Sequence, residues 1–156
     1  MDAALTWILL GLLALMLLAA SVWDLKSRTI PNGLNVAIAL LAFPFWWSVG
    51  LSLWPDVALQ VAVAALVFGV FAIAFSLGAM GGGDVKMVGA VALWLPAPAV
   101  LALLVIMSLA GGALTLAMVI RQRMAGKSGQ PEIPYGVAIA FSGLWLISER
   151  FLNQFG

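Results

Sequence analysis

Long apolar runs dominate the pattern of hydrophobic and polar positions along the chain. Five runs approach the roughly 20 residues that a helix needs to cross a bilayer, and they cover residues 3–23, 34–53, 57–77, 99–120 and 134–153. A sixth and shorter run, residues 84–95, ends at the sequence PAP (96–98), which is a natural hinge. The pattern predicts an all-α membrane protein, a polytopic bundle of about six transmembrane helices.

Composition supports this prediction. The chain has 156 residues, of which 65% are hydrophobic and only 8% are charged, whereas an ordinary soluble domain carries about 25% charged residues. We therefore expect a single integral-membrane domain over residues 1–156, with no separate soluble module. The net charge of +1 argues against a nucleic-acid partner.

The residue types that are missing narrow the chemistry. The sequence contains no cysteine and no histidine, which excludes disulfides, thiol nucleophiles, Ser-His triads and the usual zinc sites. We expect no metal and no cofactor. Catalysis, if there is any, must use Asp, Glu, Lys, Arg, Ser or Tyr side chains.

The basic residues indicate an orientation. Six of the seven lie after the first run, at the start of the fourth or after the fifth: Lys26, Arg28, Lys86, Arg121, Arg123 and Lys127. Only Arg150 lies on the opposite side. Because short cytoplasmic loops are enriched in Lys and Arg, the loops between runs one and two, three and four, and five and six should be cytoplasmic. Both termini should then be periplasmic.

Two carboxylates stand out among six. The other four have ordinary interpretations as end residues, a helix-start residue or a loop residue: Asp2, Glu149, Asp56 and Glu132. Asp24 closes the first run and Asp84 opens the fourth, so both fall on the predicted cytoplasmic side. Asp56 belongs to the other face, roughly 30 Å away across the hydrocarbon core.

Depth makes Asp84 unusual. Residues 84–95 rise only about 18 Å at 1.5 Å per residue, which is less than the roughly 30 Å of the hydrocarbon core. Asp84 should therefore lie within the bilayer, where an ionisable residue is a functional hypothesis by default. The preceding glycines, 81–83, would allow a non-helical break and the close approach of another segment. The alternative is a flexible turn with Asp84 as a helix cap.

The segment DLKSRTIPN (24–32) adds a second polar site on the same side. Pro31 suits the first turn of the second run, and Asn32 offers a polar side chain near Asp24. Two neighbouring carboxylates share a proton, so one can accept a proton from water while the other donates to a scissile carbonyl. Helix dipoles favour an anion at Asp84, which opens a helix, over Asp24, which closes one. We therefore expect Asp84 to activate water and Asp24 to be the protonated donor.

Three stretches resemble a known family. The residues Gly81-Gly82-Gly83-Asp84 match the GxGD motif of intramembrane aspartyl proteases, and GGGDVK resembles the type IV prepilin peptidases. Asp24 followed by IPN (30–32) is similar to the first aspartate site of that family, and IPYGVAIAFSG (133–143) resembles its third recurring stretch. The resemblance extends from about residue 20 to residue 143.

This resemblance implies an aspartic endopeptidase with Asp24 and Asp84 as catalytic residues. The matching motif positions would support the site: Gly81, Gly83, Lys86, Pro31, Asn32, Pro134, Tyr135 and Gly136. The implied substrate is a prepilin or pseudopilin, whose leader is cut at the cytoplasmic boundary of the bacterial inner membrane.

The chain differs from full-length members of the family in one respect. Those members carry a cytosolic insert with paired CxxC motifs before the first aspartate, whereas here the first run continues directly into Asp24. The chain is thus similar to the compact peptidases that serve Flp-type, tight-adherence pili. Full-length members also N-methylate the new N-terminus, an activity not expected here because no Gly-rich cofactor motif follows a strand.

Other interpretations of the same residues remain open. A small transporter or proton-relay subunit could use Asp24 and Asp84 as a relay, and a non-catalytic assembly factor is a third option. Lys86 either tunes the two carboxylates or extends to the interface as a topology anchor. Tyr135 either donates a hydrogen bond near the site or belongs to an interfacial aromatic belt.

Overall fold

A computed structural model describes residues 3–126 and 133–155, and within these ranges it consists of helices joined by short turns. The elements follow the chain in this order: α1 (Ala3–Ser27), α2 (Asn32–Ser48), η1 (Leu53–Val57), α3 (Ala58–Ser76), α4 (Gly82–Ala92), α5 (Ala97–Met124) and α6 (Tyr135–Phe155). The helical structure, with six α-helices in these two ranges, confirms the all-α part of the prediction from the apolar runs.

Within the described residues, three stretches are long and apolar enough to cross a membrane: α1, residues Leu53–Ser76, which comprise η1 and α3, and α5. The chain is therefore a membrane protein by length and composition of its helices. Six crossings and periplasmic termini stay predictions. The predicted roles of Asp2, Lys127 and Glu132 lie outside the described residues.

Glycines end two helices at places that the apolar runs did not indicate. The second run was expected to continue to residue 53, but α2 ends at Ser48. Gly50 has a φ of 74°, and Leu51 N–H donates to Trp46 O at 3.0 Å, which together close the helix. Gly78, with a φ of 73°, closes α3 in the same way.

The predicted non-helical break at glycines 81–83 is wrong in its location. Gly81 is the extended residue before α4, with φ −73° and ψ 143°, and Gly82 and Gly83 already belong to the helix. The sharp turn occurs upstream at Gly78. The triple glycine must therefore serve close packing rather than unusual backbone angles, and the site below gives the reason.

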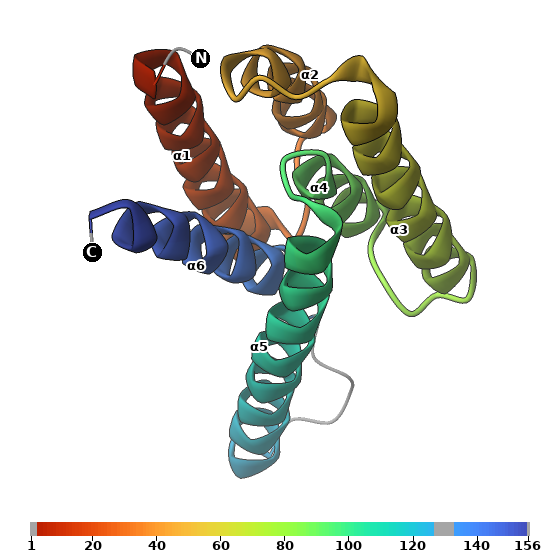
Figure 1. The fold of residues 1–156 in the computed structure, drawn as a ribbon. Coiled ribbons are helices and arrows are strands. Elements are labelled where there is room, and N and C mark those ends of the chain that lie inside the picture. The colour runs from red at the N-terminus through yellow and green to blue at the C-terminus, as the bar shows by residue number, and fades with distance from the viewer. Residues whose placement is uncertain (1–2, 127–132, 156) are drawn as a thin grey trace.

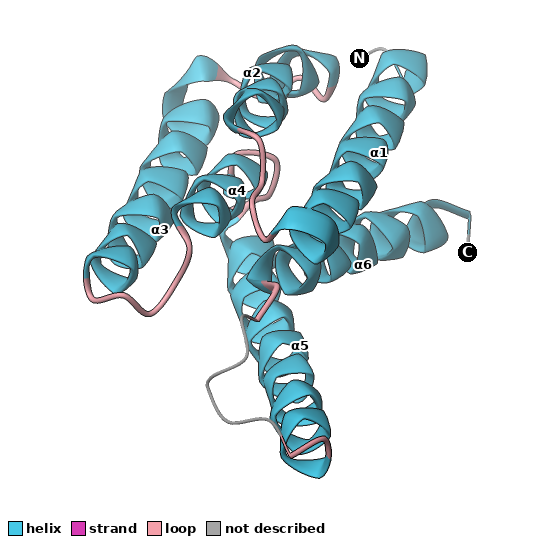
Figure 2. Ribbon diagram, turned by 180° about the vertical axis from the view of Figure 1, so that it is seen from behind, coloured by secondary structure: helices cyan, strands magenta, loops and turns pink. Residues whose placement is uncertain are grey.

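Helix α4 lies at the centre of the molecule (Figures 1 and 2). It packs against α2, α3 and α6, while α1 packs against α2 and α6. Most of α4 is buried, and α5, which packs mainly on α6, extends away from the other helices in both views. A helix that is short and buried needs no lipid-exposed face, so α4 can carry polar residues.

Two tryptophan side chains donate hydrogen bonds to backbone carbonyl groups near the C-terminal end of α4. Trp94 Nε1 donates to Ile38 O at 2.9 Å, and Trp46 Nε1 donates to Leu93 O at 2.8 Å. The Trp94 ring also packs on Phe45, with ring centroids 4.8 Å apart. These contacts fix α2 against α4, which matters because both helices carry motif residues.

Asp56 has the structural role predicted for it. It lies in the first turn of η1, and its Oδ2 accepts hydrogen bonds from Ser52 N–H at 3.1 Å and from Ser52 Oγ–H at 2.8 Å. A carboxylate at a helix start satisfies donors that have no partner within the helix. Asp56 is thus a helix-start residue.

Candidate active site

Asp24 lies in the last turn of α1 and is buried, with 4% of its surface exposed. Its Oδ2 accepts a hydrogen bond from the backbone N–H of Val137, at 3.2 Å, in the first turn of α6. The carboxylate from one end of the chain thus meets the start of the last helix, 113 residues later.

Asp84 lies in the first turn of α4 and is also buried, with 8% of its surface exposed. Its carboxylate folds back over Gly81: a Cβ added to Gly81 would lie 2.9 Å from Asp84 Oδ2. The first glycine of the motif therefore leaves room for the aspartate side chain.

The two carboxylates lie near the same helix start. Gly136 packs against Asp24, since an added Cβ would lie 2.8 Å from Asp24 Oδ2. Asp24, Asp84 and the backbone of Gly136 are close enough to one another to interact electrostatically. Gly136 lies in the first turn of α6, where backbone N–H groups lack helical partners and the dipole is positive. The start of α6 therefore provides an electropositive contact for the pair.

Gly136 has no space for a side chain. A Cβ there would lie 2.8 Å from Asp24 Oδ2 and 2.7 Å from Ile30 Cδ1. Gly83 also packs on Ile30, since its added Cβ would lie 3.4 Å from Ile30 Cβ. Ile30 is thus the common contact of the three motif segments IPN, GGGD and PYG, which explains why two glycines face it.

Asn35 links α2 to the start of α4. Its Nδ2 donates to Gly83 O at 3.1 Å, and its side chain is buried. The sequence analysis did not identify Asn35, Ile30 or Val137 as part of the site. Asn35 had a detectable signal, because it is a lone amide one turn into an apolar run. The Ile30 and Val137 contacts depend on tertiary structure alone.

Asn32 and Lys86 contact each other across the starts of α2 and α4. Lys86 Nζ donates to Asn32 Oδ1 at 2.8 Å, and both side chains are exposed. Residues two positions apart on a helix do not face the same way, so Lys86 and Asp84 lie on different faces of α4. The exposed contact with Asn32 favours the anchor role for Lys86. The expectation that Asn32 lies near Asp24 stays a prediction.

The remaining motif residues lie at the starts of α2 and α6. Pro31 directly precedes α2, and Pro134 is fully buried before α6. The Tyr135 ring packs on Gly111 of α5, where an added Cβ would lie 3.3 Å from the ring. Tyr135 thereby fixes the start of α6 against α5.

The helix-dipole argument for unequal roles was incomplete. It considered only the C-terminal end of α1, which disfavours an anion at Asp24. The Asp24 side chain also reaches the N-terminal end of α6, which favours one. Helix dipoles therefore do not separate the roles of Asp24 and Asp84.

In the described ranges, no group of three or more His, Cys, Asp or Glu residues could hold a metal ion. What the site offers is a pair of buried carboxyl groups, which can exchange protons with water and with a carbonyl group. This chemistry requires neither a cofactor nor a nucleophilic side chain.

Comparison with protein families gives one match. The model of the type IV leader peptidase family matches residues 11–116, more than half of the chain and including both Asp24 and Asp84. Comparisons with curated proteins and with solved structures gave no match. The family match confirms the resemblance inferred from the motifs. The chain therefore belongs to the type IV leader peptidase family.

Proposed function

We propose that this membrane protease is an aspartic endopeptidase that removes the leader peptide of type IV prepilins. Family membership supports a leader peptidase. The observation that carries the aspartic mechanism is that two buried carboxyl groups, from α1 and α4, lie close enough to interact with each other beside the start of α6.

The geometry supports a shared-proton mechanism. Two close carboxylates do not both ionise cheaply, so one holds a proton while the other is an anion. The anion takes a proton from water as the water attacks the scissile carbonyl, and the protonated carboxyl donates to the carbonyl oxygen. The first carboxyl then gives its proton to the leaving nitrogen as the C–N bond breaks, while the second takes a proton back from a hydroxyl of the intermediate, which restores the pair. The Gly136 amide stabilises the negative charge that remains on the pair.

The proposed site of cleavage is the cytoplasmic boundary of the bacterial inner membrane. Lys26 and Arg28 lie within four residues of Asp24, and such charges mark the cytoplasmic side. A substrate with a cytoplasmic leader and an apolar helix in the membrane would present its junction at this level. We assign the chain to the compact peptidases of Flp-type pili, because no cysteine-containing insert separates its first apolar run from Asp24.

Co-expression with a tagged Flp-type prepilin tests the proposal, with the leader loss followed by gel shift. Asp24→Asn and Asp84→Asn should each abolish processing while the protein still inserts, because each removes one member of the proton-sharing pair. Asp56→Asn is the matched control and should process normally, since Asp56 contacts only Ser52 in the described structure. Near wild-type cleavage by either site variant would contradict the aspartic mechanism and leave the relay alternative.

A further inference from the structure

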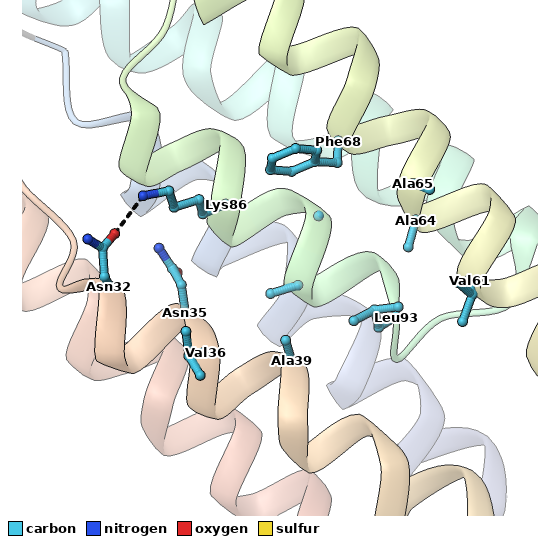
Figure 3. Close-up of a pocket in the computed structure, with 12 residues that line it drawn as sticks. Asn32, Asn35, Val36, Ala39, Val61, Ala64, Ala65, Phe68, Lys86 and Leu93 are labelled. Atoms are coloured by element: carbon cyan, nitrogen blue, oxygen red, sulfur yellow. Dashed lines mark hydrogen bonds between the residues drawn. The ribbon is translucent and has the colours of Figure 1, made fainter.

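A groove of about 590 Å³ lies between α2, α3 and α4. Neither Asp24 nor Asp84 lines it. The side chains that line the groove include Asn32, Lys86 and Phe68 (Figure 3). Lys86 lies two positions after Asp84 and therefore on a different face of α4. Ligand-binding pockets typically measure about 300–1,000 Å³. The groove is thus large enough for a ligand and separate from the carboxylate pair.

The groove opens between two helices. Both α2 and α3 pack on α4 and hardly on each other. Val36 of α2 and Val61 and Phe68 of α3 line the groove and are about half exposed. Since Leu53–Ser76 is apolar enough to span the membrane, the opening faces the hydrocarbon of the bilayer.

Polar groups gather at one end of the groove. Asn32 and Asn35 lie in the first turn of α2, and Lys86 lies near the start of α4 (Figure 3). The rest of the lining is apolar and extends toward Leu93 and Val61. The distribution of basic residues places the polar end at the cytoplasmic interface. The groove therefore has the polarity of an amphiphile, with its head at the interface and its tail toward the bilayer centre.

Two groups at the polar end lack a full set of partners. Lys86 Nζ donates one hydrogen bond, to Asn32 Oδ1, although an ammonium has three donors. Within the described residues, the charge of Lys86 has no carboxylate partner. Asn35, 4% exposed, uses Nδ2 for Gly83 O, while its Oδ1 has no hydrogen-bond partner. The polar end thus contains a cation without a carboxylate partner and a buried amide oxygen without a donor.

We propose that this groove binds an anionic phospholipid with a hydroxylated headgroup, such as phosphatidylglycerol. The phosphate would lie at Lys86, a headgroup hydroxyl would lie near Asn35, and one acyl chain would follow the apolar lining between α2 and α3. Basic pockets between transmembrane helices on the cytoplasmic side suit anionic headgroups. A helix with its side chains is about 10–12 Å across, so a substrate helix would rest at the mouth, whereas an acyl chain fits inside.

A lipid in this groove would contact the starts of two helices that carry motif residues. Asn32 and Asn35 belong to the first turn of α2, and Asn35 also holds Gly83 of the GGGD segment. A lipid bound at Lys86 would therefore join the starts of α2 and α4, the helices that carry IPN and GGGD. The proposal does not depend on the peptidase function.

Native mass spectrometry of the full chain in a neutral detergent tests the binding. Phosphatidylglycerol, phosphatidylcholine with the same chains, and glycerol 3-phosphate are added separately. We expect phosphatidylglycerol to bind about 5-fold more tightly than phosphatidylcholine, the factor that one lysine near a membrane surface supplies. Glycerol 3-phosphate should not compete, because it lacks the acyl chain.

Variants locate the site. Lys86→Gln should remove the preference for phosphatidylglycerol, and Ala65→Trp should abolish binding of both lipids by filling the groove. Ala65 lines the groove and is exposed, so the larger side chain does not enter the core. Leu66→Trp, at the next residue and outside the groove lining, is the matched control and should bind as wild type. Asp24→Asn should also bind as wild type, which separates this proposal from the catalytic one.

Three results would overturn the proposal. Equal affinity for phosphatidylglycerol and phosphatidylcholine would show that Lys86 does not bind the anionic headgroup. Full competition by glycerol 3-phosphate would indicate a phosphate site without a lipid chain. Protection of an Ala65→Cys variant from a thiol reagent by a prepilin transmembrane peptide, but not by phosphatidylglycerol, would assign the groove to the substrate.

Discussion

Replacement of Gly136 by alanine is the most direct test of how the carboxylates are held. The added Cβ would lie 2.8 Å from Asp24 Oδ2 and 2.7 Å from Ile30 Cδ1, while ordinary contacts of a Cβ begin near 3.4 Å. Ile30 Cδ1 is the end of a flexible side chain and can rotate away. Asp24 is held by Val137 N–H, so its carboxylate or the start of α6 must move by about 0.6 Å to restore ordinary contact.

The expected cost follows from this displacement. Weakening a hydrogen bond to a charged group costs about 1.5–3 kcal/mol, partly offset by the roughly 0.5–1 kcal/mol that alanine gains over glycine in a helix. We therefore expect Gly136→Ala to lower the unfolding free energy by about 1–2 kcal/mol. Because a misplacement of about 1 Å can cost about 100-fold in rate, prepilin processing should fall about 10- to 100-fold.

The assay compares cleavage rates in membranes with thermal unfolding of the purified protein. Gly112→Ala is the matched control, because its added Cβ has nothing within 4 Å. It should be neutral or more stable and should process normally. Wild-type processing by Gly136→Ala would refute the view that the α6 start positions Asp24.

Two further predictions concern packing and orientation. Asn35→Leu should lower the unfolding free energy by about 1 kcal/mol, because the loss of the donor to Gly83 O outweighs the removal of the unpaired Oδ1. Thermal unfolding measures this change. An unchanged unfolding midpoint would contradict the proposed link between α2 and α4. In intact cells, Ser27→Cys should resist a membrane-impermeant thiol reagent, because Ser27 lies on the predicted cytoplasmic side. Leu53→Cys should react, because Leu53 is 84% exposed and lies on the predicted periplasmic side. Labelling of Ser27→Cys without labelling of Leu53→Cys would reverse the predicted topology.

The sequence was sufficient to predict the helical elements and to single out the two aspartates, because both steps depend on local patterns. The catalytic role of Asp24 and Asp84 stays a prediction. Apolar runs of membrane length predict helices whatever their neighbours are, and the GGGD and IPN segments are contiguous in the chain. Helix ends were less accurate, since α2 ends at a glycine cap and not where its apolar run ends. A hydrophobic pattern carries no information about such backbone turns.

The contacts that assemble the site could not be predicted in the same way. The hydrogen bond from Val137 to Asp24 joins residues 113 positions apart, and Ile30 touches two glycines from different helices. The dipole argument failed for this reason, because it treated Asp24 as part of α1 alone. A side chain at one helix end experiences every helix end that packs on it, and these are defined only by the fold.

The glycines of GGGD and PYG follow from one requirement. A buried pair of carboxylates needs donors that stay in place, and the start of α6 supplies them only if its backbone reaches Asp24 and Asp84 without an intervening side chain. Gly136 meets this condition directly, and Gly81 clears the space for Asp84 Oδ2. Gly83 lets α4 approach Ile30, which in turn contacts Gly136. The glycines thus bring α1, α4 and α6 together around two carboxyl groups whose shared negative charge would otherwise be costly within a membrane.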